Sequence, residues 1–211
     1  NLIYNESCLD AQMRRQIYGD IYDDSMWLID LVENLLSVTR IEEGRMQIRQ
    51  SAELVDEVIK EALKHTGQSR TGRTIKVEEE DELILAKMDA RLIVQVLINL
   101  IGNAVKYTPQ GTDITVRVKK EKAENAERSQ VIISVCDLGN GIPDDRKERV
   151  FDMFYTGSDQ VADSRRSLGL GLGLCRSIIN AHGGKIWISD NIPHGAVVTF
   201  TLPAEEVALN E

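Results

Sequence analysis

The sequence predicts an α/β sandwich, in which helices cover one face of a mixed, mostly antiparallel sheet, preceded by a long α-helix. Up to Gly44 the chain contains no proline and only one other glycine, Gly19, so this stretch favours a continuous helix. After Gly44, segments with helical periodicity alternate with short segments of period two. Helices come early and between strands, and the strands follow one another largely as antiparallel neighbours, which is typical of a layered α/β domain.

Composition limits what the chain can be. Its 211 residues suit one full domain plus a smaller segment, and its net charge of −9 disfavours a nucleic-acid or anionic membrane surface. The three cysteines have no metal-ligand spacing and fit a reducing compartment. No apolar run approaches the roughly 20 residues that span a bilayer, and no signal peptide is recognised. Because the chain begins at Asn1 inside what reads as continuous structure, we expect a fragment of a longer protein.

Residues 1–44 are predicted to form a helical segment with one apolar stripe. The stripe repeats every seven residues at Ile21, Leu28 and Leu35, has a second row at Leu31 and Val38, and is interrupted by Asp24. Such a seam predicts packing against a partner helix or a second copy of the chain. The alternative is an amphipathic helix folded back on its own domain. Gly44 is the expected C-cap.

Residues 51–205 are predicted to form the α/β domain. The expected helices are 54–64, 89–107 and 172–181, and Asp89 is the expected N-cap of the second. The expected strands are 74–79, 83–87, 113–119, 130–136, 185–189 and 196–202. We expect an acidic turn to join the first two strands and a charged solvated loop, 121–129, to join the next two.

The helix 89–107 carries a polar stripe on an otherwise apolar surface. Its members are Gln95, Asn99, Asn103, Lys106 and Tyr107. An amide oxygen can ligate Mg²⁺, a lysine can meet a phosphate, and a tyrosine can lie against a base. The stripe could also be an ordinary solvated face, but asparagine is a poor helix former, and two of them one turn apart need a reason.

Two glycine motifs occur later in the chain, one directly after a strand and one at the start of a helix. Asp137, Gly139 and Gly141 come directly after the strand 130–136, where glycines let a flat ligand approach the backbone and the carboxylate can accept a hydrogen bond from it. Asp-x-Gly also occurs in plain turns. Gly169, Gly171 and Gly173 open the helix 172–181, where exposed N–H groups and the helix dipole favour an anion, although this motif alone is weak. Residues 155–168 are expected to form a flap over the site.

In this order, the motifs resemble the N, G1, F and G2 boxes of the ATP-binding catalytic domain of bacterial sensor histidine kinases, which act in two-component systems. The similarity covers about residues 51–203 and implies the histidine kinase, Hsp90 and gyrase type of ATP-binding fold. Residues 9–44 resemble the second helix of that family's dimerisation hairpin, and residues 13–17 and 25–28 are similar to the potassium-responsive Kdp sensor kinases. The motifs are Asn99 to Pro109, Asp137 to Gly141, Phe151 to Phe154, Gly169 to Leu174, and Gly195.

The resemblance implies a role for each matching residue, with ATP and Mg²⁺ as cofactors. Asn99 and Lys106 would act at the phosphates, Asn103 would ligate Mg²⁺, and Tyr107 would line the nucleotide. Asp137 would bind the adenine amine. The other expected site residues are Gly139 and Gly141 for close approach, Phe151 and Phe154 as flap anchors, and Gly169, Gly171, Leu172 and Gly173 at the phosphate-facing helix start. Two departures from the family pattern are Thr156, where many relatives carry an arginine that Arg165 or Arg166 would have to replace, and Ala196, where relatives often carry threonine.

The phosphate acceptor of that family is a histidine followed by an acidic residue and a proline. None of the three histidines, His65, His182 and His194, has this context, and each is expected to be structural or exposed. The resemblance therefore implies an acceptor helix upstream of Asn1, a second copy in a homodimeric parent, and a response regulator as partner. It also implies the cytoplasmic portion of a membrane-anchored bacterial sensor, with no direct membrane contact in this fragment.

Three function classes remain open at this point. The first is phosphoryl transfer from ATP to histidine. The second is ATP hydrolysis of the gyrase or Hsp90 type, which places a glutamate base one turn before the magnesium asparagine; here that residue is Asn99, and an amide cannot take a proton. The third is a non-catalytic docking module, which Thr156 keeps open.

Overall fold

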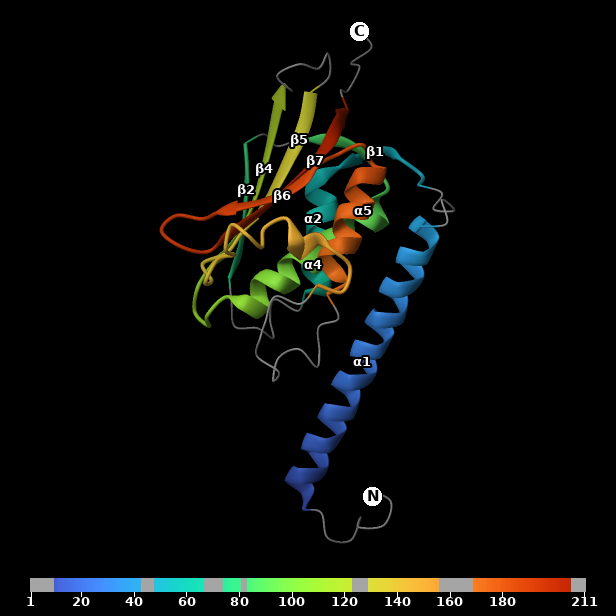
Figure 1. The fold of residues 1–211 in the computed structure, drawn as a ribbon, viewed down its shortest axis with the longest axis vertical. Coiled ribbons are helices and arrows are strands. Elements are labelled where there is room, and N and C mark those ends of the chain that lie inside the picture. The colour runs from blue at the N-terminus through green and yellow to red at the C-terminus, as the bar shows by residue number, and fades with distance from the viewer. Residues whose placement is uncertain are drawn as a thin grey trace.

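The computed structural model describes residues 10–42, 48–66, 74–80, 83–122, 129–155 and 169–205. A long helix, α1 (Ala11–Glu42), extends from an α/β domain. Its C-terminal end lies near the domain and its N-terminal end points away from it (Figure 1). Asp10 begins this helix because its carboxylate accepts a hydrogen bond from the Met13 N–H at 2.7 Å. The expected C-cap, Gly44, lies outside the described residues.

The apolar stripe of α1 is open where its side chains are described. Ile21 and Leu28 are each 51% exposed, although α1 contacts α5 of the domain. The helix therefore does not bury these two residues on its own domain, which disfavours the alternative that it folds back. The side chains of Leu31, Leu35 and Val38 lie outside the described part of the structure.

The domain is built on a seven-stranded sheet with the order β1-β3-β7-β5-β4-β2, and β6 also pairs with β7. All pairings in the described residues are antiparallel except β2 with β4, which confirms the predicted mixed, mostly antiparallel sheet. The strands are β1 (Ser51–Leu54), β2 (Ile75–Glu79), β3 (Leu85–Met88), β4 (Ile114–Lys122), β5 (Ser129–Cys136), β6 (Ile186–Asp190) and β7 (Ala196–Glu205).

The sheet differs from the expectation in two respects. The strands β2 and β3 are close in sequence but lie far apart in the strand order, so they are not antiparallel neighbours. β2 instead pairs in parallel with β4, and β3 pairs with β1 and β7. β1 itself was not predicted, because four residues give too short a pattern to distinguish from the start of the following helix.

Three helices, α2 (Val55–His65), α4 (Ala90–Tyr107) and α5 (Gly171–Ala181), cover one face of the sheet (Figure 1). A short 3₁₀ turn, η2 (Arg149–Phe151), precedes α5. The sheet contributes alternate residues to the shared core, among them Ile114, Val116 and Val118 of β4. On the opposite face, Ser134 and Thr199 share a hydrogen bond of 2.9 Å between their hydroxyl groups. The core thus places α4 and α5 side by side.

Asp89 precedes α4 as predicted, but its side chain makes no capping hydrogen bond. Its carboxylate instead accepts a hydrogen bond from the Arg49 N–H at 3.3 Å, so only its backbone carbonyl serves the first turn. Cys136 and Cys175 are free and buried, as expected of core residues, whereas Cys8 lies outside the described residues. Within the described ranges, no helix has the length and hydropathy to cross a bilayer.

Candidate functional site

The polar stripe of α4 lies where the sequence places it. The apolar side of the helix is buried through Ile93, Leu97, Leu100 and Ala104. On the stripe, Gln95, Asn99 and Asn103 are half-buried, whereas Lys106 and Tyr107 are exposed. The Lys106 ammonium lies 5.0 Å from the centroid of the Tyr107 ring. The C-terminal half of α4 therefore presents amides, a cation and a phenol on a single surface.

Asn99 carries an unsatisfied group. Its Nδ2 atom is buried and has no hydrogen-bond partner in the described part of the chain. Leaving such a donor unpaired costs about 1–3 kcal/mol, so it is an unusual feature for an otherwise well-packed helix. The neighbouring Cys175 thiol offers no strong acceptor; burial raises its pKa to about 12, and the nearby Asn99 amide lowers it only in part. Asn99 is thus arranged as if for a partner that the described residues do not supply.

The start of α5 lies directly against this asparagine. A Cβ placed on Gly171 would lie 3.6 Å from the Asn99 Oδ1 atom, an ordinary van der Waals contact. Leu172, the next residue, is half-buried and packs on the core. The first residues of α5 and the amide stripe of α4 therefore share one surface. The N–H groups of the first turn of α5 lie at that surface.

The carboxylate of Asp137 is fixed by the protein through one of its oxygens. Oδ1 accepts hydrogen bonds from the Gly139 N–H at 2.8 Å and from the Ala196 N–H at 3.2 Å. The Asp137 N–H donates in turn to the Ala196 carbonyl at 2.9 Å. Both hydrogen bonds that the described residues donate to this half-buried carboxylate end on Oδ1, so a ligand would meet a pre-oriented acceptor at Oδ2.

Close backbone contacts join this loop to α4 and to β7. A Cβ on Gly139 would lie 2.7 Å from the Tyr107 carbonyl oxygen, so the loop sits on the C-terminal end of α4. At Gly195, φ is +113° and a Cβ would lie 2.0 Å from the Asp137 carbonyl oxygen, so only glycine fits there. Gly141 lies against Gly195 at the same junction. The Asp137 loop, α4 and the start of β7 are therefore locked together.

The turn between β6 and β7 adds two residues that were not predicted as site residues. Asn191 donates from Nδ2 to the Asp137 carbonyl at 2.8 Å, and the Nδ1 atom of His194 lies 3.2 Å from the Gly139 carbonyl oxygen. Nothing in the local sequence of Asn191 signals this contact, because its partner is 54 residues away. His194 was expected only as a turn residue. Both support the Asp137 loop.

Phe151 and Phe154, both expected as anchors, have different environments. Phe151 is 3% exposed and packs against Ile188 and Ala196, whereas Phe154 is 64% exposed and has a φ of +65°. The Phe154 N–H donates to the Gly169 carbonyl at 3.1 Å, so this residue is held through its backbone. Side-chain anchoring therefore holds for Phe151 alone.

The segment ending at Phe154 also packs on the start of α5. A Cβ on Gly173 would lie 2.8 Å from the Met153 Sδ atom and 3.1 Å from the Phe151 carbonyl oxygen. The expected flap lies outside the described residues apart from Tyr155, whose ring centroid is 5.0 Å from the Arg149 guanidinium. Thr156, Arg165 and Arg166 also lie outside them.

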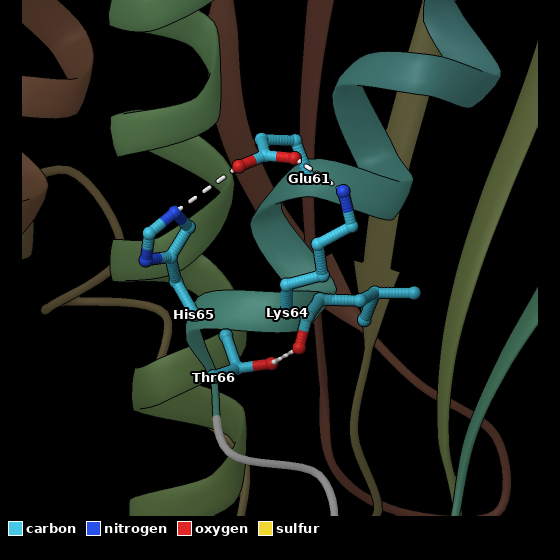
Figure 2. A network of polar contacts seen from close by, with 5 residues as sticks. Glu61, Lys64, His65 and Thr66 are labelled. Atoms are coloured by element: carbon cyan, nitrogen blue, oxygen red, sulfur yellow. Dashed lines mark hydrogen bonds and ion pairs between the residues drawn. The ribbon is translucent and has the colours of Figure 1, made fainter.

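The three histidines all have protein partners. Figure 2 shows His65 directed at Glu61 across one turn of α2, with Nε2 and Oε1 3.3 Å apart, while Lys64 pairs with the other oxygen of Glu61 at 2.7 Å. In the same view the Thr66 hydroxyl donates to the Leu63 carbonyl at 3.0 Å. The Lys64 hydrogen bond lowers the pKa of the Glu61 carboxyl. His182 is buried and His194 contacts the Asp137 loop. His65 and His182 thus fit the expected structural or exposed roles.

The chain is similar to several known proteins. Residues 88–206 match the family described as histidine kinase-, DNA gyrase B-, and HSP90-like ATPases. The chain is 38% identical over 204 residues to the sensor protein KdpD of Clostridium acetobutylicum, with 97% of this chain and 22% of that protein covered. It is 30% identical over 195 residues to the adaptive-response sensory kinase SasA of Gloeothece citriformis, with 92% and 48% covered. The chain therefore spans less than half the length of either relative.

Solved structures share the fold. The histidine kinase ThkA in complex with the response regulator TrrA matches with a TM-score of 0.67 and 26% identity, covering 97% of this chain and 55% of that one. Full-length ShkA in complex with AMPPNP matches with a TM-score of 0.73 and 21% identity, covering 93% and 40%. The expected α/β sandwich and the resemblance to sensor histidine kinases, including the Kdp group, are confirmed.

Proposed function

Because the chain belongs to the family of histidine kinase-, DNA gyrase B- and HSP90-like ATPases, we propose that it is the catalytic part of a sensor histidine kinase. In this proposal it transfers the γ-phosphate of Mg²⁺–ATP to a histidine outside this chain, for relay to a response regulator. We assign residues 51–205 to the ATP-binding catalytic domain and residues 1–44 to a dimerisation hairpin.

One observation carries the proposal: two glycine motifs that are distant in sequence converge on the polar stripe of α4. Gly139 lies against the Tyr107 backbone, and Gly171 lies against the Asn99 side chain. The Asp137 carboxylate is anchored at one side of this surface, and the N-terminus of α5 lies at the other. An acceptor for an adenine amine at one end and N–H groups for phosphates at the other match the two ends of ATP.

The residues of the stripe fit the phosphate end. Mg²⁺ is usually held by one or two protein oxygens together with substrate phosphates, and Asn103 supplies an amide oxygen there. When bound, Mg²⁺ would neutralise the charge that develops during phosphoryl transfer. Lys106 would add a second positive charge, and the Asn99 amide would donate toward the phosphates.

Asn99 favours phosphoryl transfer to a histidine over hydrolysis of ATP. A carboxylate one turn before the metal-binding asparagine could accept a proton from attacking water, whereas a neutral amide can only orient that water. General-base assistance contributes roughly 10²–10⁴-fold, so its absence protects bound ATP until the acceptor histidine arrives. We therefore expect phosphate release under saturating ATP to stay below about 1 s⁻¹. Faster turnover would place the chain among the hydrolysing members of its family.

None of the three histidines is suited to accept the phosphate. His182 is 2% exposed and both of its ring nitrogens are engaged, His65 is paired with Glu61, and His194 lies beside the Gly139 carbonyl on the adenine side of the site. The acceptor must approach the γ-phosphate closely and in line. Incubation with radiolabelled ATP should therefore leave no acid-labile phosphate on this chain alone. A longer form carrying an acceptor histidine should become labelled.

The partners follow from the same assignment. The open stripe at Ile21 and Leu28 of α1 fits packing in a homodimer, against the acceptor helix and a second copy. A response regulator is the proposed recipient of the phosphate, as the ThkA complex with TrrA illustrates for that kinase. We place the chain in the cytoplasmic portion of a membrane-anchored bacterial sensor.

The substitution Asp137→Asn tests the site most directly. The introduced amide keeps an oxygen for the Gly139 and Ala196 N–H groups but presents a donor in place of Oδ2, so the loop is retained while the acceptor is lost. A charge-assisted hydrogen bond of about 1.5–3 kcal/mol predicts an ATP affinity roughly 10- to 150-fold weaker by calorimetry. Asp144→Asn, at an exposed carboxylate paired with Lys147, is the matched control and should bind ATP normally. Equal affinity in both folded variants would remove Asp137 from the site.

A further inference from the structure

The two helices that form the phosphate side of the site, α4 and α5, pack antiparallel along their length. Contacts occur at three levels, and residue numbers that increase along α4 pair with residue numbers that decrease along α5. Asp89 meets His182 at one end, Val96 meets Cys175 in the middle, and Asn99 meets Gly171 at the other end. The proposed ligand surface lies at the Asn99 end. Its geometry therefore depends on how α5 is placed along α4.

The far end of this seam is held by a buried histidine that the proposed chemistry does not use. The His182 Nε2 atom accepts a hydrogen bond from the Asp89 N–H at 3.0 Å. Because Nε2 accepts, the ring proton must be on Nδ1, which donates to the Ile178 carbonyl at 2.7 Å. His182 thus joins an otherwise unpaired N–H at the start of α4 to the last turn of α5.

Other contacts along the seam are less directional. The Cys175 thiol lies 3.9 Å from the Val96 carbonyl oxygen, a weak hydrogen bond, and belongs to the apolar core that the two helices share. Apolar surfaces tolerate a small slide or rotation, whereas a hydrogen bond with both atoms buried does not. The Asp89 carboxylate, which also lies here, is already engaged by the Arg49 N–H. His182 is the group at this end that fixes both helices at once.

We propose that His182 is a positioning residue for nucleotide binding: by fixing the register of α5 on α4, it sets where Gly171 and the N–H groups after it lie relative to Asn99. The proposal rests on the proposed ATP site. His182 does not touch the ligand, because the ten residues from Asp89 to Asn99 place it about 15 Å away along α4. Its effect is transmitted by two rigid helices.

Two substitutions separate positioning from simple packing. His182→Gln places an amide oxygen where Nε2 stands and can accept from the Asp89 N–H, whereas His182→Phe keeps the ring volume and removes both hydrogen bonds. A third variant, Val131→Ala, removes core volume from β5 of the sheet while keeping both hydrogen bonds of His182, and serves as the stability control. Each variant is compared by thermal unfolding, by calorimetry with Mg²⁺–ATP, and by ¹H–¹⁵N correlation spectra without nucleotide.

We expect His182→Phe to weaken ATP about tenfold at a temperature where it is fully folded, and His182→Gln to recover most of this loss. Val131→Ala should lose stability but bind ATP like the unmodified chain. In the nucleotide-free spectra, the Asn99 side-chain and Gly171 amide signals should shift in His182→Phe and stay in place in Val131→Ala. Unchanged signals and unchanged affinity in folded His182→Phe would overturn the proposal. If the unmodified chain fails to bind ATP, the proposed function fails, while the spectra still decide whether His182 positions the helices.

Discussion

The two halves of α4 share one buried apolar side, which includes Leu100 and Ala104 in the second half, but they differ on their other surfaces. The start of the first half is tied to His182 and Arg49. In the second half, the buried Nδ2 of Asn99 has no partner among the described residues, a Cβ on Gly102 would meet no atom within 4 Å, and Lys106 is exposed.

The difference separates two kinds of residue on one helix. The buried apolar side chains should govern stability. The second half also carries a buried donor without a partner among the described residues and a helix-destabilising glycine, and such features are expected where function has been favoured over stability. Stability and ligand binding should therefore respond to different residues of the same helix.

The largest expected effect tests this separation with two neighbouring substitutions. Leu97→Ala leaves a cavity in the core and should lower the free energy of unfolding by about 2–5 kcal/mol, with ATP affinity unchanged in the folded protein. Asn99→Ala removes an unpaired donor, so stability should change by less than about 1 kcal/mol while phosphotransfer to an acceptor histidine is lost. Urea unfolding and a transfer assay measure the two effects. A large stability loss in Asn99→Ala would break the comparison.

The second effect concerns a glycine contact on the functional half. Gly139→Ala would bring a Cβ to 2.7 Å from the Tyr107 carbonyl, so the loop must move and ATP affinity should fall roughly tenfold or more. Gly19→Ala, in α1 and outside the site, is the matched control, because a Cβ there meets nothing within 4 Å and a helix position favours alanine. Calorimetry should show a clear loss only in the first variant. Similar losses in both would mean that the Asp137 loop is not packed on α4 as described.

A smaller effect of opposite sign is expected at Gly102. It lies exposed within α4, and a Cβ there meets nothing within 4 Å, so Gly102→Ala should raise the free energy of unfolding by about 0.5–1 kcal/mol. Gly195→Ala, where φ is +113° and the Asp137 carbonyl blocks the space, should destabilise instead. Thermal unfolding of both variants measures the contrast. No gain in Gly102→Ala would indicate that this half of the helix is already optimised for stability.

The smallest effect concerns Oε1 of Glu79 on β2, a buried atom without a hydrogen-bond partner among the described residues. Burial raises the pKa of this carboxyl, Asp56 adds to the rise, and Lys60 opposes it. Because the folded-state pKa is raised, the contribution of this carboxyl to stability is fully present below the unfolded-state pKa of about 4.3. It is lost as the pH rises through the folded-state pKa. Glu79→Gln should therefore be more stable than the unmodified chain at pH 7, with the difference vanishing below about pH 4. A difference that persists in acid would exclude ionisation as the cause.

Much of the fold and the site could be predicted because the signals are local. The apolar side of α4, the alternation in β4 and β5, and the two glycine motifs are all patterns within about 20 residues, and each forms the predicted type of element. The predicted strands corresponding to β4 and β7 ended too early, because charged or proline-containing strand ends weaken the alternating pattern.

The partners of these elements were decided by the tertiary structure. No local pattern shows whether β2 pairs with β4 or with β3, because strand pairing depends on which edges remain free once the core has packed. Asn191, His182 and Asp89 act through partners 54 to 93 residues away, and their sequence neighbours do not signal these contacts. The sequence by itself determined which side chains could be predicted as nucleotide-binding residues. The packing of α5 on α4 and of the Asp137 loop on both β7 and α4 decided where they meet, because buried polar groups must find partners and only the assembled core brings those partners together.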